Sequence, residues 1–178
     1  MTLAASCAGM GFGNAGVHLA HGCSYAISGL NPGWSPPTGY PAAPLVPHGV
    51  SVVLSAPAVF QATAAACPER HMEAAKILRG DNPPAVVSMY TSRRSEERRT
   101  DADVATAAGA AIADQLRQLM SVMDVPDGLS ALGYTSADVP ALVAATLPQR
   151  RVLALAPSAE NADEEHLTAI FTNSLKCY

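Results

Sequence analysis

The clearest hydrophobic pattern along the chain lies between residues 102 and 123, where apolar side chains recur at steps of three and four. This spacing puts them on one face of a helix, so the segment is predicted to be an amphipathic helix with that face in the core. The predicted inner stripe consists of Val104, Ala108, Ala111, Ile112, Leu116, Leu119 and Met123. A shorter stripe of the same kind is formed by Leu167, Ile170, Phe171 and Leu175.

Boundary residues mark the other helices. Pro68 suits the first position of a helix, because its missing N–H is not needed there, and Gly80 is expected to end that helix. Ser136 is predicted to start another helix, with a proline in its first turn. The last helix is predicted to begin at Asn161, with Glu164 three residues later in the positions of a capping box.

The remaining segments are less regular. Residues 4–28 are rich in Ala, Gly and Ser and are predicted to form a buried helix, since small side chains let a backbone or a ligand approach closely. Residues 29–47 contain repeated Pro and Gly and are predicted to be a loop. Between residues 50 and 54 every second position is apolar, which permits a strand as well as a helix. Residues 81–101 are polar and charged and read as a surface insertion.

Composition favours an all-α protein and excludes several function classes. Hydrophobic residues make up 49% and charged residues 15% of the 178, which argues against a disordered chain. Aromatic residues contribute only 5% while alanine is abundant, a balance that favours helices over sheets. The net charge of -4 offers no basic surface for nucleic acid. The arginines between residues 93 and 99 are interrupted by two glutamates and are expected to be a solvated loop.

No membrane span, targeting segment or disulfide framework is expected. The most apolar stretch, residues 49–66, is interrupted by Pro57 and by polar side chains, so it is expected to fall short of a bilayer-crossing segment. The N-terminus lacks the basic start and the uninterrupted apolar run of a signal peptide. The four cysteines show no metal-finger spacing and are expected to be reduced, buried small side chains.

Histidines are the main candidates for chemistry. His18 and His21 are three residues apart, so on a helix they share a broad face, and His48 follows the Pro-rich loop. Two imidazoles from different elements can converge on one metal ion. Loose histidine pairs are common, however, and on spacing alone a structural or surface role is the better reading for any one of them.

Two longer strings change that weighing. Residues 13–22 read Asn-Ala-Gly and then His-Gly, and residues 47–50 read Pro-His-Gly-Val. In this order, with a Pro/Gly loop between them, they resemble the metal-binding signature of iron-type (group III) alcohol dehydrogenases. The resemblance implies the all-α, C-terminal helical metal-binding domain of a dehydroquinate synthase-like fold, here a partial single domain over residues 1–178. That family holds a divalent metal with one Asp and three His, and His21 and His48 match the third and fourth ligands.

Further strings resemble the hydroxyacid–oxoacid transhydrogenase branch of the family; they span residues 8–18, 24–29, 57–60, 68–71, 127–129 and 147–150. The branch implies metal-dependent hydride transfer through NAD, from 4-hydroxybutyrate or 3-hydroxybutyrate to 2-oxoglutarate, giving 2-hydroxyglutarate. It also implies Fe2+ as the metal, with Zn2+ as the second choice. Small hydroxyacids and oxoacids are then the partners, with a mitochondrial location and a possible homo-oligomer.

Tyr25 is the candidate catalytic residue. Many family members have a second His four residues after the third ligand, and this chain has Tyr25 there, one helical turn from His21. Its hydroxyl could bond a substrate oxygen, or the ring could simply be packed, and both readings stay open. His18 fits the branch as a support of the metal site or as a satisfied core histidine. His71 and His166 are expected to face solvent, and Cys23 is expected to be packing.

The cofactor site is expected to lie outside this chain. Residues 11–16 match the letters of the GxGxxG dinucleotide-binding motif. They follow no predicted strand and fall within the metal-site segment, so they are not interpreted as that motif and no cofactor-binding residue is assigned. The Asp and the first His of the metal site would lie upstream of Met1. The chain alone is therefore expected to bind metal weakly and to be inactive. Two alternatives remain: a non-catalytic helical module or half-enzyme that needs a partner chain, and a simple iron-type NAD-dependent alcohol dehydrogenase.

Overall fold

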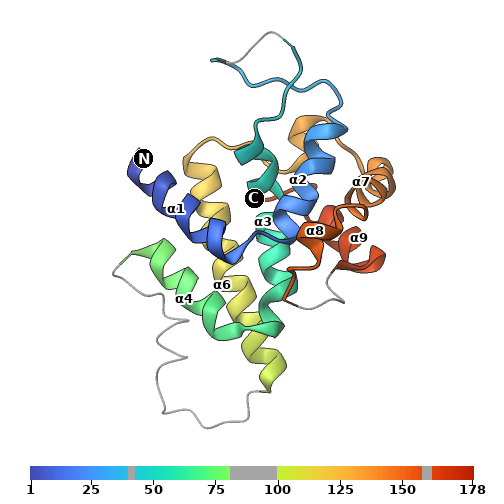
Figure 1. Ribbon diagram of the computed structural model, residues 1–178. Helices are drawn as coiled ribbons and strands as arrows, with labels where there is room; N and C mark the ends of the chain where they lie inside the picture. The colour runs from blue at the N-terminus through green and yellow to red at the C-terminus, as the bar shows by residue number, and fades with distance from the viewer. Residues whose placement is uncertain (40–42, 81–99, 158–161) are drawn as a thin grey trace.

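The computed structural model describes residues 1–39, 43–80, 100–157 and 162–178, and this part of the chain is helical with no strand, as the composition predicts (Figure 1). Its α-helices are α1 (Thr2–Ala15), α2 (Leu19–Gly29), α3 (His48–Thr63), α4 (Pro68–Arg79), α6 (Asp101–Val122), α7 (Val139–Thr146), α8 (Arg150–Leu153) and α9 (Glu164–Asn173). Short 3-10 turns, η1 (Ala64–Ala66), η2 (Leu129–Leu132) and η3 (Ser136–Asp138), connect some of them.

Helix α3 lies at the centre of the arrangement. It packs against α2, α6 and α9, while α4 covers α6 and α7 covers α2 and α9. The main core is apolar and includes the fully buried Leu19, Ile27, Leu54 and Phe171. A smaller cluster, built around Met72 and Ile112, joins α4 to α6. The core thus holds α2 and α3 side by side, and these are the helices that carry the candidate site.

The alternation between residues 50 and 54 turns out to be helical, as the family resemblance implies. Helix α3 runs without a break through Pro57, which is buried. Proline cannot donate the backbone hydrogen bond of its turn, so the packing of the apolar side chains around it must offset that loss. By length and hydropathy alone the helical window 48–66 could cross a bilayer, against the expectation for this stretch. Half of that window, 50%, is buried inside the protein, as in the core helix of many folds.

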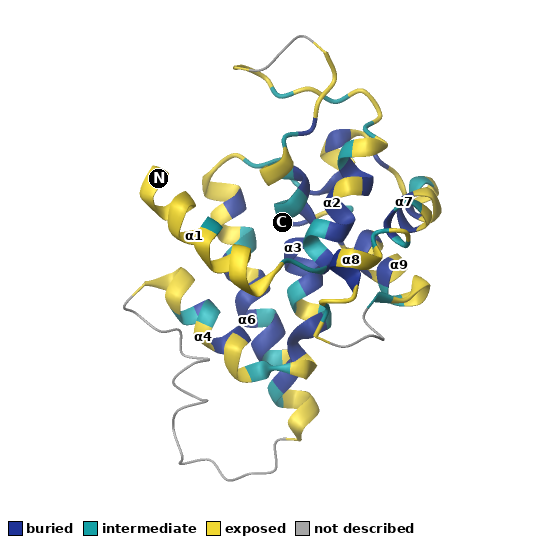
Figure 2. Ribbon diagram, in the orientation of Figure 1, coloured by how far each residue is buried: buried dark blue, intermediate teal, exposed yellow. Residues whose placement is uncertain are grey.

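The prediction of one buried helix over residues 4–28 is wrong. The segment forms two helices, and the break falls at Gly16, whose φ of 80° is a left-handed backbone conformation that ends α1. No residue of α1 is buried, and Figure 2 shows this helix exposed over most of its length. Its large apolar side chains Leu3, Met10 and Phe12 are all exposed. Helix α2 is the part that enters the core.

Helix boundaries confirm most of the local signals. Helix α4 begins at Pro68, and Gly80, with φ 81°, ends it. Helix α6 begins at Asp101, the last residue of the predicted insertion, with a capping box between Thr100 and Asp103. Residues 81–99 lie outside the described part. The turn at 136–138 leads directly into α7.

Two details of the helix predictions need correction. Helix α9 begins at Glu164 with Asp163 as its cap, whose side chain accepts from the His166 N–H; the expected cap, Asn161, lies outside the described residues. In α6, Leu119 is exposed and Met123 lies beyond the helix, also exposed. Helix α6 packs against both α3 and α4, so its buried face is wider than the predicted apolar stripe. This face also includes small and polar residues, such as Gly109 and Gln115.

Gly109 is expected to be required where α6 crosses the end of α3. A Cβ built at Gly109 would lie 3.0 Å from the Ala64 Cβ and 3.1 Å from the Gln61 Cα, and backbone cannot move aside cheaply. Gly109→Ala should therefore lower the free energy of unfolding, although alanine is the better helix former by about 1 kcal/mol. The matched control is Gly11→Ala, in the middle of α1 with no atom within 4 Å, which should raise the helix content in circular dichroism. A stabilised Gly109→Ala variant in urea unfolding would contradict this packing.

Candidate functional site

His21 and His48, the two predicted metal ligands, are brought together by the packing of α2 against α3. His21 lies in the first turn of α2 and His48 is the first residue of α3. Their ring centroids are 5.2 Å apart and the rings are tilted by 59°. Two imidazoles bound to one tetrahedral metal, with nitrogen about 2.1 Å from the ion, also place their centroids about 5 Å apart. The observed spacing therefore fits a shared metal ion.

The electrostatic surroundings favour neutral imidazole, the form that binds metal. Burial lowers the pKa of His21 from its ordinary value, and the nearby His48 lowers it further. A neutral ring keeps a nitrogen lone pair free at neutral pH, so a metal ion has no proton to displace. His21 is half-buried and His48 is exposed, which leaves the pair open to solvent on one side.

Two aromatic side chains border the pair. The Tyr25 ring is stacked on His48, with centroids 6.5 Å apart and planes 27° apart, and Tyr25 is exposed. Phe12 of α1 lies with its centroid 6.4 Å from that of His21. Tyr25 lies on α2, one turn after His21, and borders the pair through His48. Phe12 was not assigned from the sequence, because the break at Gly16 that turns α1 toward α2 is not visible in the helical periodicity.

The described residues bring together two of the side chains that a four-ligand metal site would need. Among them no group of three or more His, Cys, Asp or Glu side chains is close enough to hold a metal ion. His21 and His48 fit a metal in their spacing, and the lowered pKa of His21 favours its metal-binding form, but a structural metal site usually has four protein ligands and a catalytic one three. The pair would thus bind a divalent ion weakly without further donors.

His18 precedes His21 at the start of α2 and is not the satisfied core histidine that one reading predicted. It is the N-cap residue of α2, and its Nδ1 is buried with no hydrogen-bond partner in the described structure. Burial lowers the pKa of His18, and the charges of His21 and His71 would lower it further. Protonation of this ring in the folded state is therefore disfavoured.

The lowered pKa of His18 predicts loss of stability in acid. The unfolded chain takes up protons as pH falls below 6.5, the ordinary pKa, whereas folded His18 and His21 resist until their lower pKa values are reached. The free energy of unfolding should therefore fall across that window and change little above it. The His18→Gln variant should show a shallower fall in urea unfolding at several pH values, the rest being due to His21. An equally steep fall in the variant would rule out His18 as a contributor.

The other titratable candidates are structural. His71 is buried, against expectation: its Nδ1 lies 2.8 Å from the Cys67 carbonyl oxygen and its Nε2 lies 3.1 Å from the Thr63 hydroxyl. His71 lies on the buried side of α4, and its contact with Thr63 links this helix to the end of α3. His166 is half-exposed and pairs with Asp163 at 2.8 Å.

The cysteines match their expectation only in part. Cys23 is fully buried, as expected of packing, and burial raises the pKa of its thiol to about 12. Cys177 is also buried, and its thiol lies 3.4 Å from the Leu54 carbonyl oxygen. Cys7 is exposed because it belongs to α1, which is uncovered, and Cys67 is partly exposed. All four are free thiols.

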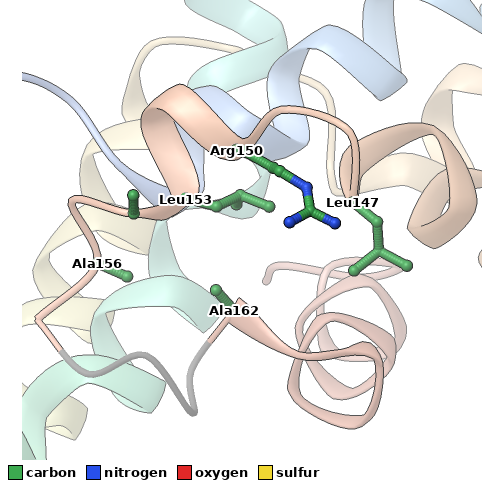
Figure 3. Close-up of a pocket in the computed structure, with 6 residues that line it drawn as sticks. Leu147, Arg150, Leu153, Ala156 and Ala162 are labelled. Carbon is green, nitrogen blue, oxygen red and sulfur yellow. The ribbon is translucent and has the colours of Figure 1, made fainter.

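A separate hollow of about 500 Å³ opens between α7, α8 and the start of α9 (Figure 3). The described residues that line it are Leu147, Arg150, Leu153, Ala154, Ala156 and Ala162. None of the candidate metal-site residues is among them. Leu153 is nevertheless relevant to the site, because its Cδ2 lies beside Gly22, the residue after His21.

Comparison with known proteins identifies the family of the chain. Residues 1–175 match the family model "Fe-containing alcohol dehydrogenase family, C-terminal". The chain is 48% identical over its full length to "Hydroxyacid-oxoacid transhydrogenase, mitochondrial" of Bos taurus and of Homo sapiens. It is 43% identical to "Probable hydroxyacid-oxoacid transhydrogenase, mitochondrial" of Dictyostelium discoideum, also over 100% of the chain.

The match covers only part of these relatives. The chain spans 34% of the bovine and human proteins and 29% of the Dictyostelium one. No solved structure matches the chain significantly. The family is metal-dependent by name, which agrees with the paired imidazoles of α2 and α3. On the family match and these identities, the chain belongs to the Fe-containing alcohol dehydrogenase family, within its C-terminal part.

Proposed function

We propose that the chain is the metal-bearing helical part of a hydroxyacid–oxoacid transhydrogenase. The observation that carries the proposal is the convergence of His21 and His48 from two helices, with centroids 5.2 Å apart, in a member of this family. The relatives named as transhydrogenases support the same reaction. It would move a hydride from 4-hydroxybutyrate or 3-hydroxybutyrate to 2-oxoglutarate and form 2-hydroxyglutarate.

In this proposal His21 and His48 hold a divalent metal ion. The family name favours Fe2+, while imidazole ligands suit Zn2+ equally. When bound, the metal supplies Lewis-acid polarisation of the substrate oxygen. The protein contributes by keeping His21 neutral through burial and by holding both rings on packed helices, so that the ligands are oriented before the metal arrives.

Tyr25 is proposed to orient the substrate. It lies one helical turn after His21, and its ring stacks on His48 at the exposed side of the pair. Its phenol can donate a hydrogen bond to a substrate oxygen near both imidazoles. Phe12 of α1 places an apolar ring next to His21. NAD is assigned to the whole enzyme, and no cofactor-binding residue is proposed on this chain.

The relatives' names support a mitochondrial location, which we extend to the protein that contains this chain. A homo-oligomer is compatible with the exposed α1 but is not required by it. Size-exclusion chromatography with light scattering measures this directly.

A chimera tests the proposed function. Residues 1–178 replace the matching part of the bovine relative, to which they are 48% identical, and hydride transfer from 4-hydroxybutyrate to 2-oxoglutarate is followed by the formation of 2-hydroxyglutarate. The chimera should be active, and its His21→Ala and His48→Ala variants inactive, while His166→Ala, half-exposed and remote in sequence, keeps its activity. In Tyr25→Phe the rate should fall while the metal content is unchanged.

Three outcomes would contradict the proposal. A folded, metal-loaded chimera without transfer activity would refute the reaction. Full activity in both histidine variants would refute the metal site. Reduction of free NAD by simple alcohols, with no transfer to an oxoacid, would instead identify an NAD-dependent alcohol dehydrogenase of the same family.

A further inference from the structure

The stretch that carries His21 is flanked by two glycines, and a leucine from a distant turn covers each of them. A Cβ built at Gly16 would lie 2.6 Å from the Leu155 Cδ1, and one built at Gly22 would lie 2.8 Å from the Leu153 Cδ2. Carbon atoms do not approach this closely without a shift of one of them. Leu155 therefore lies against the backbone of Gly16, at the end of α1, and Leu153 against the backbone of Gly22, in α2; the two contacts fall on either side of His21 in the sequence.

These leucines belong to a short hydrogen-bonded turn. The Gln149 carbonyl accepts the N–H groups of Val152 at 3.0 Å and Leu153 at 3.1 Å, and the Ala156 N–H donates to the Leu153 carbonyl at 3.0 Å. Leu153 is 6% exposed, whereas Leu155 is 51% exposed. Leu153 thus packs in the core, whereas Leu155 lies at the surface, beside Gly16.

The start of α2 depends on what holds residues 16–22 in place. The His21 and Gly22 N–H groups both donate to the His18 carbonyl, at 2.9 and 3.0 Å, and these bonds form the first turn of the helix. The His18 Nδ1 has no hydrogen-bond partner in the described structure, so this atom adds no bond to the turn. The close approach of Leu153 and Leu155 to Gly22 and Gly16 supplies packing from outside the helix on this turn.

We propose that Leu153 and Leu155 are positioning residues for His21: their contacts with Gly22 and Gly16 set where α2 begins and so fix the spacing between His21 and His48. This inference rests on the proposed function insofar as that function makes His21 a metal ligand. It adds a support from the α8 turn that lies outside the metal-binding motifs.

Zinc binding by the 178-residue chain tests the positioning role. Zn2+ is titrated while the imidazole nitrogen resonances of His21 and His48 are followed by NMR, and thermal unfolding checks that each variant is folded. Leu155→Ala is the key variant, because its side chain is half exposed and its loss should change stability little. It should weaken zinc binding at the pair by about tenfold or more, as the loss of a metal-site support typically does. Ile77→Ala, which removes an exposed side chain of α4, should bind zinc as the unchanged chain does.

A size exchange provides the second arm. Leu153→Ala should weaken zinc binding and also destabilise the core. Adding Gly22→Ala puts a methyl group near the place that the Leu153 Cδ2 vacates, so the double variant should recover part of the affinity. If the turn has only a structural role, Leu153→Ala should lower stability, but adding Gly22→Ala should not restore zinc affinity.

The outcomes separate the inference from the proposed function. If the unchanged chain shows no joint zinc response of His21 and His48, the metal site and the positioning role both fail. If the unchanged chain binds zinc at the pair and folded Leu155→Ala and Leu153→Ala variants bind it equally well, the positioning role alone is overturned. If Leu153→Ala does not fold, Leu155→Ala and the double variant still decide the matter.

Discussion

Replacing His48 with alanine is expected to remove zinc binding from the site, lowering the affinity by more than about 100-fold. Loss of a group that only supports a metal ligand typically costs about 10–100-fold in affinity, and loss of one of two ligands should exceed that. His48 is the first residue of α3 and is exposed, so the variant should keep its stability. Isothermal titration with Zn2+ measures the affinity, and thermal unfolding measures the fold.

His166→Ala is the matched control for this prediction. His166 is half-exposed and its ring pairs with Asp163 at the start of α9, so its removal should leave zinc binding at the His21–His48 pair unchanged. The claim of a shared site fails if His48→Ala binds zinc as tightly as the unchanged chain. It also fails if His166→Ala loses binding to the same extent.

Replacing Phe171 with alanine is expected to lower the free energy of unfolding by about 3–5 kcal/mol, the usual cost of truncating a buried phenylalanine. Phe171 is 0% exposed and joins α9 to the core shared with α3 and α7. Other large side chains of the same core cluster, such as Leu54 and Leu142, are also fully buried, so the truncation would leave a cavity inside the core. Urea unfolding should show a lower midpoint with little change in slope.

The adjacent Thr172→Ala variant controls for effects on the helix itself. Thr172 is exposed on the same turn of α9, so its replacement should change the free energy of unfolding by no more than about 0.5 kcal/mol. A loss below about 1 kcal/mol in Phe171→Ala would show that α9 does not pack as described.

Local signals in the sequence predicted the helices whose ends are decided by adjacent residues. Pro68 and Gly80 mark both ends of α4, because the first lacks an unneeded N–H and the second adopts a left-handed conformation. The same reasoning failed for residues 4–28. There a single glycine, Gly16, turns the chain between α1 and α2, and several other glycines nearby look the same in the sequence.

The candidate site could be predicted only with the family resemblance. From their spacing in the sequence, His21 and His48 could not be recognised as neighbours. The loop between them shows no regular pattern, so its residues do not tell how close it brings the two histidines. Contacts made in three dimensions were invisible for the same reason: Phe12 beside His21, and Leu153 on Gly22. His71 was misjudged because the polar residues around it in sequence face solvent, while its own side chain turns inward to Thr63.

A crystal structure of the chain grown with Zn2+, with anomalous scattering measured at the zinc edge, tests the central claim most directly. The account predicts one zinc peak within about 2.1 Å of a ring nitrogen of both His21 and His48, with solvent completing the coordination. A peak bound to only one of the two rings, or to other histidines while this pair stays empty, would contradict a shared metal site.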